Sequence, residues 1–336
     1  MATRADVARF AGVSESTVSY VLSGKRKISA KTSERVQAAM AALGYTPNAI
    51  ATGLAGGRTT IVAWHFPVGT RRLSLTEFEY VYAATQAAGA AGRHLLLWTG
   101  EIADAADLER LTATQLIDGI ILTEIVADDP RIELLQATGI PFALVGLPAE
   151  PGDLPYVDAD FDEIGRMAVE HLHELGHRRI AMLADDAEPL RVGYSPLLRL
   201  GDALRRWSAV HEIELTMLSG GSTVAQGRAL GCSPDFPSVT AVLGLNPMTL
   251  VGVMEGRIAQ GVRIPADLSF LALGVSESTA MLTRPHLTTV FPSGEEIGRH
   301  GVHLLEEVID GTGARQVLVP AQIHIGASTG PAATTR

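Results

Sequence analysis

Short apolar runs alternate with amphipathic stretches along the chain from residue 60 onwards. The runs occupy residues 60–66, 94–100, 117–123, 141–146, 178–185, 213–219, 241–246 and 268–274. Helical periodicity fills the gaps between them and is clearest at 76–91, 104–115 and 160–175. Apolar runs of this length, separated by helices, are typical of buried parallel strands. The pattern therefore predicts an α/β protein with doubly wound parallel sheets.

The strand series starts twice, and this predicts two subdomains. The second series begins at residue 178, directly after the helical stretch at 160–175. Ligands of doubly wound sheets bind beyond the carboxyl ends of the strands. We therefore expect a small-molecule site in a cleft between the two subdomains.

The first sixty residues show helical periodicity without strands. A first helix carries an apolar face that includes Phe10. Gly12 tolerates the positive φ of a tight turn, and Ser14 is a favourable N-cap for a second helix at 14–22, in which Val18 faces inward. A small residue at the helix contact, a corner glycine and a β-branched core residue have the spacing of a helix-turn-helix. A plain helical hairpin is the alternative.

A third amphipathic helix is expected at 31–45, and a less regular segment follows it at 46–59. Pro47 can begin a short helix in that segment. A helix of about eight residues is unstable alone in water. We therefore expect the segment to need a surface on which to fold.

Charge is distributed unevenly along the chain. The formal net charge is −10, yet residues 1–60 hold eight Lys or Arg against three acids. All three lysines lie between positions 25 and 31. A small basic head on a large acidic body indicates a polyanion as the partner of the head alone. A solvated charged face is the alternative.

Composition argues against several other classes. Hydrophobic residues make up 46% of the chain, which is typical of a globular protein. The apolar runs fall short of the roughly 18 residues that a membrane span needs, and the first residues lack the apolar stretch of a secretory signal. The single Cys232 leaves no internal disulfide or multi-cysteine metal site. These observations favour a cytoplasmic protein.

Three segments of the first sixty residues resemble the lactose-repressor/galactose-repressor (LacI/GalR) family of transcription regulators. They are DVARFAGVSESTVSYVLSG, KTSERVQAAMAALGYTPNAIA and GRT. The resemblance implies that residues 14–22 enter the major groove of an operator and that 47–55 folds into a helix only there. Leu54 and its copy in a second chain would then wedge into the minor groove at the axis of a homodimer and bend the DNA.

The positions expected to contact DNA are polar residues of the second helix, the lysines and three positions of the hinge. They are Ser14, Glu15, Ser16, Thr17, Ser19, Tyr20, Lys25, Lys27, Lys31, Asn48, Ala51 and Leu54. Tyr20 stands where many family members carry an arginine, and a tyrosine hydroxyl cannot read guanine bidentately. The operator half-site is therefore expected to differ from the commonest one.

The resemblance continues through the body in several segments, among them QLIDGIIL, HLHELGHRRIAML and GVRIPADLSFLALG. They look like the periplasmic-binding-protein-like core of these repressors. The implied organisation is a headpiece at 1–45, a hinge at 46–59 and an effector-binding and dimerisation core at 60–330. The N-subdomain is expected at about 60–157 and 288–318, and the C-subdomain at about 158–287 and 319–330.

Positions at which the family commonly grips sugars differ in this chain. Pro247 and Val275 stand where acidic residues are common, and Leu197 stands where an arginine is often found. Sugar hydroxyls need several aligned donors and acceptors. The departures therefore favour an effector other than a standard sugar, or a weakened response. The candidate effector residues are Trp64, His65, Phe78, Asp158, Asp160, Arg191, Arg199 and Asn246, with a turn or packing role as the alternative for each.

These features predict a sequence-specific DNA-binding regulator. The family's usual behaviour favours a repressor that a sugar or another metabolite releases from a palindromic operator. The C-terminal residues lack apolar heptads, which favours a homodimer over a tetramer. A small-molecule receptor with the same two-lobed core, not acting through DNA, is the alternative.

Other chemistry finds little support in the residues. A Ser-His-Asp or paired-carboxylate arrangement is not identifiable, so we expect neither an enzyme nor a cofactor. His173 and His177 have a spacing that can ligate zinc, but a third ligand pattern does not accompany them. We therefore expect no metal site.

Overall fold

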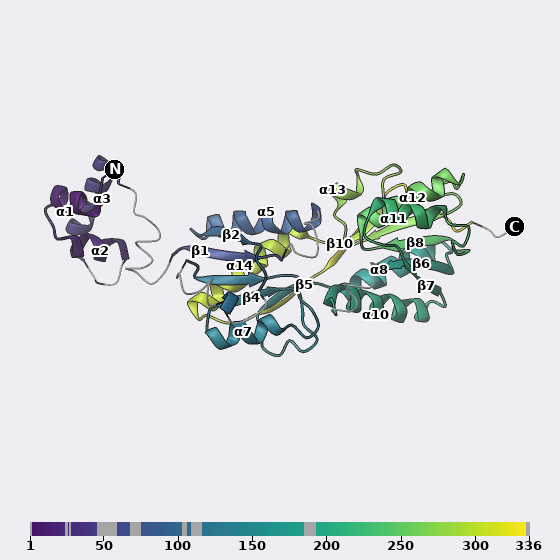
Figure 1. Ribbon diagram of the computed structural model, residues 1–336, viewed down its shortest axis with the longest axis horizontal. Helices are drawn as coiled ribbons and strands as arrows, with labels where there is room; N and C mark the ends of the chain where they lie inside the picture. Colours follow the sequence, from purple (N-terminus) through teal and green to yellow (C-terminus); the bar gives the residue numbers. More distant parts are fainter. Residues whose placement is uncertain are drawn as a thin grey trace.

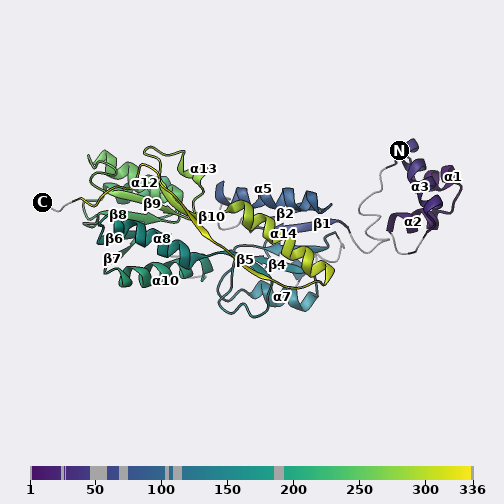
Figure 2. The ribbon, with the colours of Figure 1, turned by 180° about the vertical axis from the view of Figure 1, so that it is seen from behind.

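The computed structural model describes residues 2–23, 26, 28–45, 59–67, 75–102, 106–108, 116–184 and 193–333. Three units follow one another along the longest axis, a small helical unit at the N-terminus and then two α/β lobes (Figure 1). The view from behind shows the same order, with the first lobe in the middle (Figure 2). Within the described residues, none of the helices is long and apolar enough to cross a lipid bilayer.

The N-terminal unit, residues 2–45, is here called the headpiece. It consists of α1 (Arg4–Ala11), α2 (Glu15–Ser23) and α3 (Ala30–Leu43). Thr3 and Asp6 form a capping box at the start of α1, and Gly12 ends α1 at a φ of 62°, a conformation that glycine adopts without strain. Val18 and Val36 are fully buried between the helices. The structure thus confirms the expected helix-turn-helix and third helix.

The side of α1 that faces the headpiece core differs from the expected one. Val7 and Ala11, four residues apart, lie in the core of the headpiece. Phe10 was expected on this apolar face but is 64% exposed. One turn of a helix can bury only one side, and the small residues Val7 and Ala11 take that side.

The first lobe is built on a six-stranded sheet with the strand order β11-β5-β4-β3-β1-β2, and its neighbouring pairs are all parallel. The strands are β1 (Ile61–His65), β2 (His94–Trp98), β3 (Gly119–Leu122), β4 (Phe142–Val145), β5 (Tyr156–Ala159) and β11 (Gln316–Val319). Helices α5 (Leu75–Ala90) and α14 (Gly294–Asp310) cover one face and α7 (Pro130–Thr138) covers the other.

The second lobe repeats this plan with the order β12-β10-β9-β8-β6-β7. Its strands are β6 (Arg179–Ala184), β7 (Glu214–Ser219), β8 (Ala241–Gly244), β9 (Ser269–Leu273), β10 (Thr288–Pro292) and β12 (Ala321–His324). Only β12 runs antiparallel to its neighbour within this sheet. Helices α8 (Phe161–Glu174) and α10 (Ser195–Val210) pack on one face, α11 (Val224–Cys232) and α12 (Pro247–Ala259) on the other, and the short α13 (Glu277–Ala280) follows β9.

The two parallel-sheet lobes and the eight expected strands are confirmed. Each apolar run contains a strand, and the helical stretches at 76–91 and 160–175 correspond to α5 and α8. Within the helix expected at 104–115, the structure describes only residues 106–108, and these are helical. The periodicity did not reveal β5, β10, β11 or β12.

The chain crosses between the lobes after Ala159, Pro292 and Val319. Because β5 leads out of the first sheet and β10 out of the second, the carboxyl ends of both parallel sheets face the junction between the lobes. The sequence placed the second crossing before Thr288. However, β10 pairs in parallel with β9, so residues 288–292 belong to the second lobe. The other two crossings fall within two residues of the expected boundaries.

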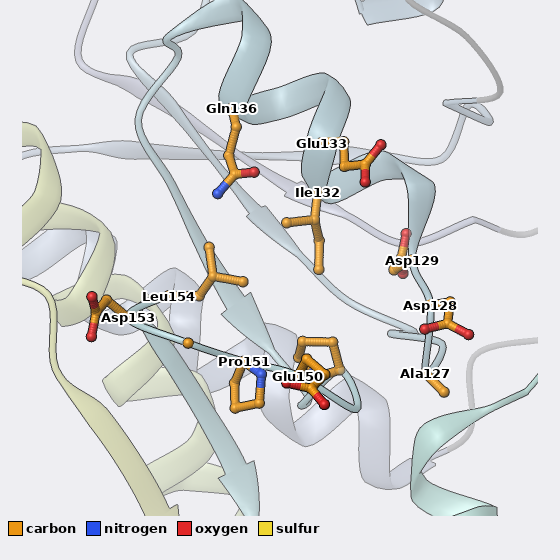
Figure 3. A pocket seen from close by; sticks show the side chains of 12 residues that line it. Ala127, Asp128, Asp129, Ile132, Glu133, Gln136, Glu150, Pro151, Asp153 and Leu154 are labelled. Atoms are coloured by element: carbon orange, nitrogen blue, oxygen red, sulfur yellow. The ribbon is translucent and has the colours of Figure 1, made fainter.

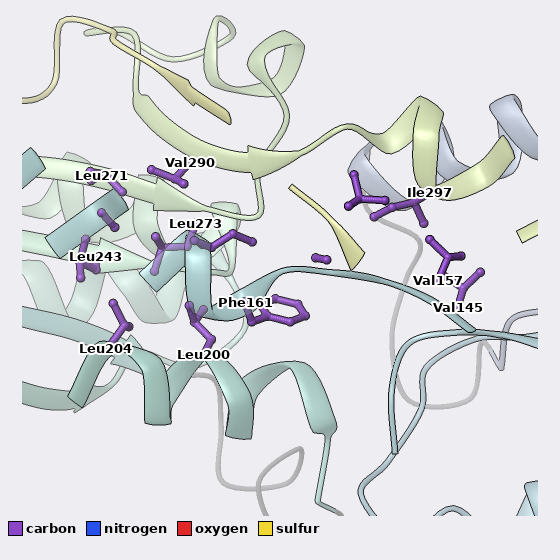
Figure 4. Packing of buried hydrophobic residues seen from close by; sticks show 14 of the residues in the cluster. Val145, Val157, Phe161, Leu200, Leu204, Leu243, Leu271, Leu273, Val290 and Ile297 are labelled. Atoms are coloured by element: carbon purple, nitrogen blue, oxygen red, sulfur yellow. The ribbon is translucent and has the colours of Figure 1, made fainter. Parts of the chain in front are cut away.

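One apolar cluster runs through both lobes (Figure 4). It joins Val157 and Ile297 of the first lobe to Leu271 and Leu273 of the second, with Phe161 at the first crossing. Separating the lobes near the crossings would expose this cluster to water, at roughly 25 cal/mol per Å² of apolar surface. The lobes are therefore expected to rotate about the crossings rather than to move apart there.

Helices α11 and α12 approach each other through glycines. A Cβ atom on Gly252 would lie 2.3 Å from the carbonyl oxygen of Val224, and one on Gly227 would lie 2.3 Å from that of Thr249. Neighbouring backbone atoms cannot give way as a flexible side chain can. Glycine is thus required for the packing of these two helices.

We expect Gly252→Ala to destabilise the protein by about 2 kcal/mol, because the added methyl group overpacks a backbone contact. Gly89→Ala on α5 is the matched control, since no atom lies within 4 Å of its Cβ position. Relief of backbone entropy should stabilise that variant by about 0.5–1 kcal/mol. Urea unfolding of the two variants measures the difference, and equal changes in both would contradict the packing argument.

Candidate nucleic-acid interface and effector site

The second helix of the headpiece presents a polar face to solvent. Its predicted contact residues that are exposed or half-buried are Ser14, Glu15, Ser16, Thr17, Ser19 and Tyr20. Val18, within the same stretch, is fully buried. Hydroxyl, carboxylate and phenol groups are therefore accessible on the part of α2 that faces away from the headpiece core, where they can approach base edges and phosphates.

The turn before α2 sets the direction of this face. Arg35 of α3 donates hydrogen bonds to the carbonyl oxygens of Ala11 and Gly12, the latter over 3.1 Å. Ser14 Oγ accepts a hydrogen bond from the backbone N–H of Thr17 at 3.1 Å and thereby caps α2. The Ser14 hydroxyl thus orients the helix whose face it joins.

Cationic groups border the polar face. The guanidinium of Arg26, which the sequence reasoning did not select, lies 5.9 Å from the centroid of the Tyr20 ring, within the range of a cation–π contact. Lys31 is exposed in the first turn of α3. The other predicted DNA contacts, which lie outside the described residues and stay predictions, are Lys25, Lys27, Asn48, Ala51 and Leu54.

Two predicted effector residues are buried inside the first lobe. Trp64 is 1% exposed and belongs to the apolar cluster beneath α14. His65 Nε2 lies 2.8 Å from the carbonyl oxygen of Gly100, and Nδ1 lies 3.4 Å from Arg131 Nη1. The Gly100 carbonyl only accepts, so Nε2 carries a proton, and the Arg131 guanidinium only donates, so Nδ1 accepts and the ring is neutral. Burial lowers the pKa of His65 to about 4, and the hydrogen bond to Gly100 opposes that shift.

Two more candidates cap helices at the junction between the lobes. Asp160 Oδ1 accepts the N–H of Glu163 at 3.0 Å at the start of α8. Asn246 Oδ1 accepts the N–H of Met248 at 2.9 Å at the start of α12. Helix capping accounts for these residue types at strand ends without a ligand.

Two other candidates, Phe78 and Arg191, are not placed at the junction by the described residues. Phe78 is 59% exposed on α5 and is not enclosed between the lobes. Arg191 lies outside the described residues. Phe78 therefore adds no group to the junction, and the role of Arg191 stays a prediction.

Asp158 and Arg199 form an ion pair across the junction. Asp158 lies on β5 of the first lobe and Arg199 on α10 of the second, with side chains 8% and 26% exposed. The guanidinium also lies 5.3 Å from the centroid of the Phe161 ring. Burial raises the pKa of Asp158 to about 6 against the opposing charge of Arg199. These two predicted residues thus meet, and their pairing weakens as Asp158 takes up a proton in mild acid.

A second contact between the lobes was not anticipated from the sequence. The backbone N–H of Ala127, after β3, donates to Gly193 O at 2.8 Å, and that of Ser195, at the start of α10, donates to Ile125 O at 3.2 Å. We call these two hydrogen bonds the latch. Backbone pairing of such short segments leaves no residue pattern, because any residue except proline can donate.

The lobes also meet between α5 and α13. Ser276 N–H donates to Thr76 Oγ1 at 3.4 Å, and Ser278 Oγ donates to Glu79 Oε1 at 2.6 Å. A pocket of about 690 Å³ lies beside these contacts, and residues of both lobes, including Phe291, line it. The junction is therefore bridged by the chain itself at more than one place.

A second hollow, of about 550 Å³, lies in the first lobe beside the latch residue Ala127 (Figure 3). Glu133 of α7 lines one side, and Glu150 and Asp153 of the loop before β5 line the other. The charged residues that line it are all acidic. This part of the body therefore repels a polyanion.

The histidines of α8 and the turn after it have partners within the second lobe. His171 Nε2 lies 3.0 Å from Thr329 Oγ1, the His173 ring lies 4.6 Å from that of His211, and His177 is buried. A group of three or more residues able to hold a metal ion does not occur in the described part of the chain. Packing explains these residues in the structure.

Comparisons with known proteins agree with both parts of the molecule. Residues 3–48 match the family described as bacterial regulatory proteins, lacI family, and residues 169–329 match the periplasmic binding protein-like domain. The HTH-type transcriptional regulator CelR of Thermobifida fusca is 31% identical over 335 residues, which cover 95% of each chain.

Two solved structures are similar over nearly the whole chain. The lac repressor dimer bound to operator and the anti-inducer ONPF has a TM-score of 0.80 at 25% identity, covering 98% of this chain and 99% of the other. A complex of the transcriptional regulator CelR with cellobiose has a TM-score of 0.69 at 27% identity, covering 98% of this chain and all of the other.

The neutral, buried His65 predicts a specific dependence of stability on pH. Its pKa is lower in the folded state than the ordinary 6.5, so its contribution is present above pH 6.5 and is lost as the pH falls towards 4. Between pH 7 and pH 5 we expect the wild type to lose about 2 kcal/mol more stability than His65→Gln, which cannot be protonated. Urea unfolding at both pH values measures this, with the exposed His94→Gln as control. Parallel losses in wild type and His65→Gln would contradict the assignment.

Proposed function

The chain belongs to the lacI family of bacterial regulatory proteins, and on this premise we propose that it is a repressor that binds a palindromic operator as a homodimer. A small molecule bound between the lobes controls its operator affinity. The observation that carries the proposal is an exposed polar helix of a helix-turn-helix, joined in one chain to two lobes whose strand ends face each other. The similar proteins are transcriptional regulators, which disfavours a receptor that does not act through DNA.

The headpiece reads DNA through α2 in this proposal. Glu15 accepts a hydrogen bond from a cytosine amino group, and Tyr20 contacts a base through its hydroxyl or its ring. Lys31 neutralises a phosphate. The similar lac repressor structure is bound to its operator, which supports this use of the headpiece. The folding of residues 47–55 into a helix on DNA, with Leu54 in the minor groove, completes the proposal.

Exposed apolar side chains support the homodimer. Phe78 and Tyr82 on α5 are exposed, and so are Met281 and Leu282 directly after α13, which contacts α5. Large apolar groups that gather on one surface mark a protein–protein interface. The similar lac repressor structure is a dimer. A second copy of the chain is therefore the proposed occupant of this surface.

The effector is proposed to bind beyond the strand ends, near Asp158 and Arg199. The similar CelR structure contains cellobiose, which supports a sugar. In this chain, however, Asn246 caps α12 and the apolar Val275 follows β9, so fewer groups are free for hydroxyls. We therefore propose a metabolite with fewer hydroxyl groups than a standard sugar.

The arrangement of the lobes suggests which state the structure represents. The chain is similar over nearly its whole length to the lac repressor bound to operator, with a TM-score of 0.80. This supports assigning the latched arrangement to the operator-binding state. An effector then acts by binding better to an arrangement in which the latch is broken.

Tyr20→Ala tests the reading of DNA. The loss of one base contact should weaken binding to a duplex selected by the wild type by about ten- to a hundredfold, because such a contact contributes about 1–3 kcal/mol. Binding to unrelated DNA should change little, since phosphate contacts dominate it. Titration of labelled duplexes measures both affinities.

The control for this variant is Gln37→Ala, which removes an exposed polar side chain from α3. It should leave both affinities unchanged. If Tyr20→Ala weakened specific and unrelated DNA equally, α2 would not be the reading helix.

A disulfide across the latch tests the control by the lobes. A Cβ atom on Gly193 would lie 3.8 Å from Ala127 Cβ, which is the usual separation in a disulfide. The φ of Gly193 is 72°, so a cysteine is strained there, and the oxidised and reduced forms share that strain. In a Cys232→Ser background, oxidised Ala127→Cys/Gly193→Cys should bind the operator with the affinity of its reduced form. It should no longer be released by a metabolite that releases the reduced form.

Cellobiose is the first probe, followed by metabolites that shift the melting temperature of the wild type. The single variant Ala127→Cys is the control for the substitution and for the oxidant. If the cross-linked protein were released from the operator at the same metabolite concentration as the reduced protein, breaking the latch would not be part of the effector response.

A further inference from the structure

A buried cluster of charged side chains lies at the amino ends of the first-lobe strands, opposite the junction between the lobes. Asp118 precedes β3, Arg93 precedes β2, and Glu306 lies towards the end of α14. Their side chains are 6%, 8% and 21% exposed. The function proposed above does not use these residues.

The Asp118 carboxylate holds the chain where it enters the first lobe. Its Oδ1 accepts the backbone N–H of Thr59 at 2.6 Å and the Thr59 hydroxyl at 3.0 Å, and its Oδ2 accepts the N–H of Thr60 at 3.1 Å. Both residues directly follow the segment that joins the headpiece to the body. The position of that segment's end is therefore set by one side chain.

The backbone at Thr60 supports this role. Its φ is 63°, in the left-handed region that a β-branched residue rarely adopts. Such a conformation persists only where the surroundings over-determine it. The Asp118 carboxylate and the hydrogen bond from His94 N–H to Thr60 O, at 2.8 Å, supply that constraint.

Arg93 connects Asp118, and with it Thr59 and Thr60, to α14. It donates a hydrogen bond to Asp118 Oδ2 through Nη1. Its Nη2 donates to Glu306 Oε2 at 3.1 Å, and its Nε lies 2.9 Å from Glu306 Oε1. One planar guanidinium thus binds two carboxylates, an arrangement that fixes geometry as well as charge.

Helix α14 extends from this cluster to the other end of the lobe. It begins at Gly294, directly after β10 of the second lobe, and its 17 residues span about 25 Å. A Cβ atom on Gly298 would lie 2.2 Å from the carbonyl oxygen of Tyr80, so α14 packs backbone to backbone on α5. A helix held in this way moves as a rigid body.

We propose that Asp118, Arg93 and Glu306 form a linker anchor, which positions Thr59–Thr60 and couples them to α14, the helix that starts at the crossing between the lobes. A rotation of the second lobe shifts the start of α14, and the anchor passes that shift to the chain leading to the headpiece. The inference rests on the proposed function, for which it names Asp118, Arg93 and Glu306 as residues that position the linker.

Glu306→Gln and Asp118→Asn test the anchor in the full-length dimer. Each variant should weaken binding to the selected operator duplex at least tenfold, because a loosely held linker presents the two headpieces at a lower effective concentration. Binding to unrelated DNA should stay within twofold. In the double variant the loss should be smaller than the product of the single losses, because both act through Arg93.

Glu307→Gln, on the same helix, is the matched control. It removes the ion pair with Arg315, which lies between α14 and β11, without touching the anchor. It should retain operator affinity within twofold. Circular dichroism and the dimer mass establish that each variant is folded.

The outcomes separate the anchor from the proposed function. If the wild type selects no duplex, the proposed function fails. If the wild type binds and the folded anchor variants bind equally well, or if the single losses simply multiply in the double variant, the anchor is overturned.

Discussion

Three crossings of the chain limit how the two lobes can move relative to each other. The crossings follow Ala159, Pro292 and Val319, and the apolar cluster around Phe161 runs between them. Opening the lobes at the crossings would expose that cluster, whereas rotation about them changes only the contacts farther away. The latch and the contact between α5 and α13 are such contacts. The topology thus turns binding between the lobes into a rotation.

The polar groups at the junction are largely used by the protein itself. Asp160 and Asn246 cap helices, and Asp158 pairs with Arg199. A buried ion pair gains little net free energy over its desolvation, and burial already raises the pKa of Asp158 to about 6. Two arrangements of the lobes can therefore lie close in free energy. A metabolite with a modest difference in affinity for the two arrangements is then sufficient to shift their populations.

Local patterns in the sequence were enough to predict the fold. The strands and the helix-turn-helix follow from apolar periodicity, caps and one glycine, all of which act between residues close in sequence. The edge strands β11 and β12 escaped because each spans only four residues and includes a glutamine, which shortens the apolar run. The boundary before Thr288 was wrong because pairing with β9 assigns that strand to the second lobe.

The candidate site was predictable only in part, for a related reason. The sequence singled out Asp158 and Arg199, which the structure pairs across the junction, and their role toward an effector stays a prediction. Residue type alone does not distinguish a buried Trp64 or a capping Asn246 from a ligand contact. The latch is made by backbone atoms and leaves no mark in the sequence. The anchor joins Arg93 to Glu306, 213 positions away, and a contact at that separation exists only through the fold.

Because the headpiece has only a small core, the position of the anchor can affect DNA affinity. The residues buried in it are valines and alanines, such as Val7, Val18 and Ala39. A unit of this size, with so little apolar surface to bury, is only marginally stable alone. The operator stabilises, by mass action, the arrangement of the headpieces that it binds. The affinity for DNA therefore includes the free energy of ordering the headpieces and the chain that leads to them. A fixed Thr59–Thr60 lowers that ordering cost at every encounter. A shift of the anchor by α14 raises the cost without changing any contact to DNA.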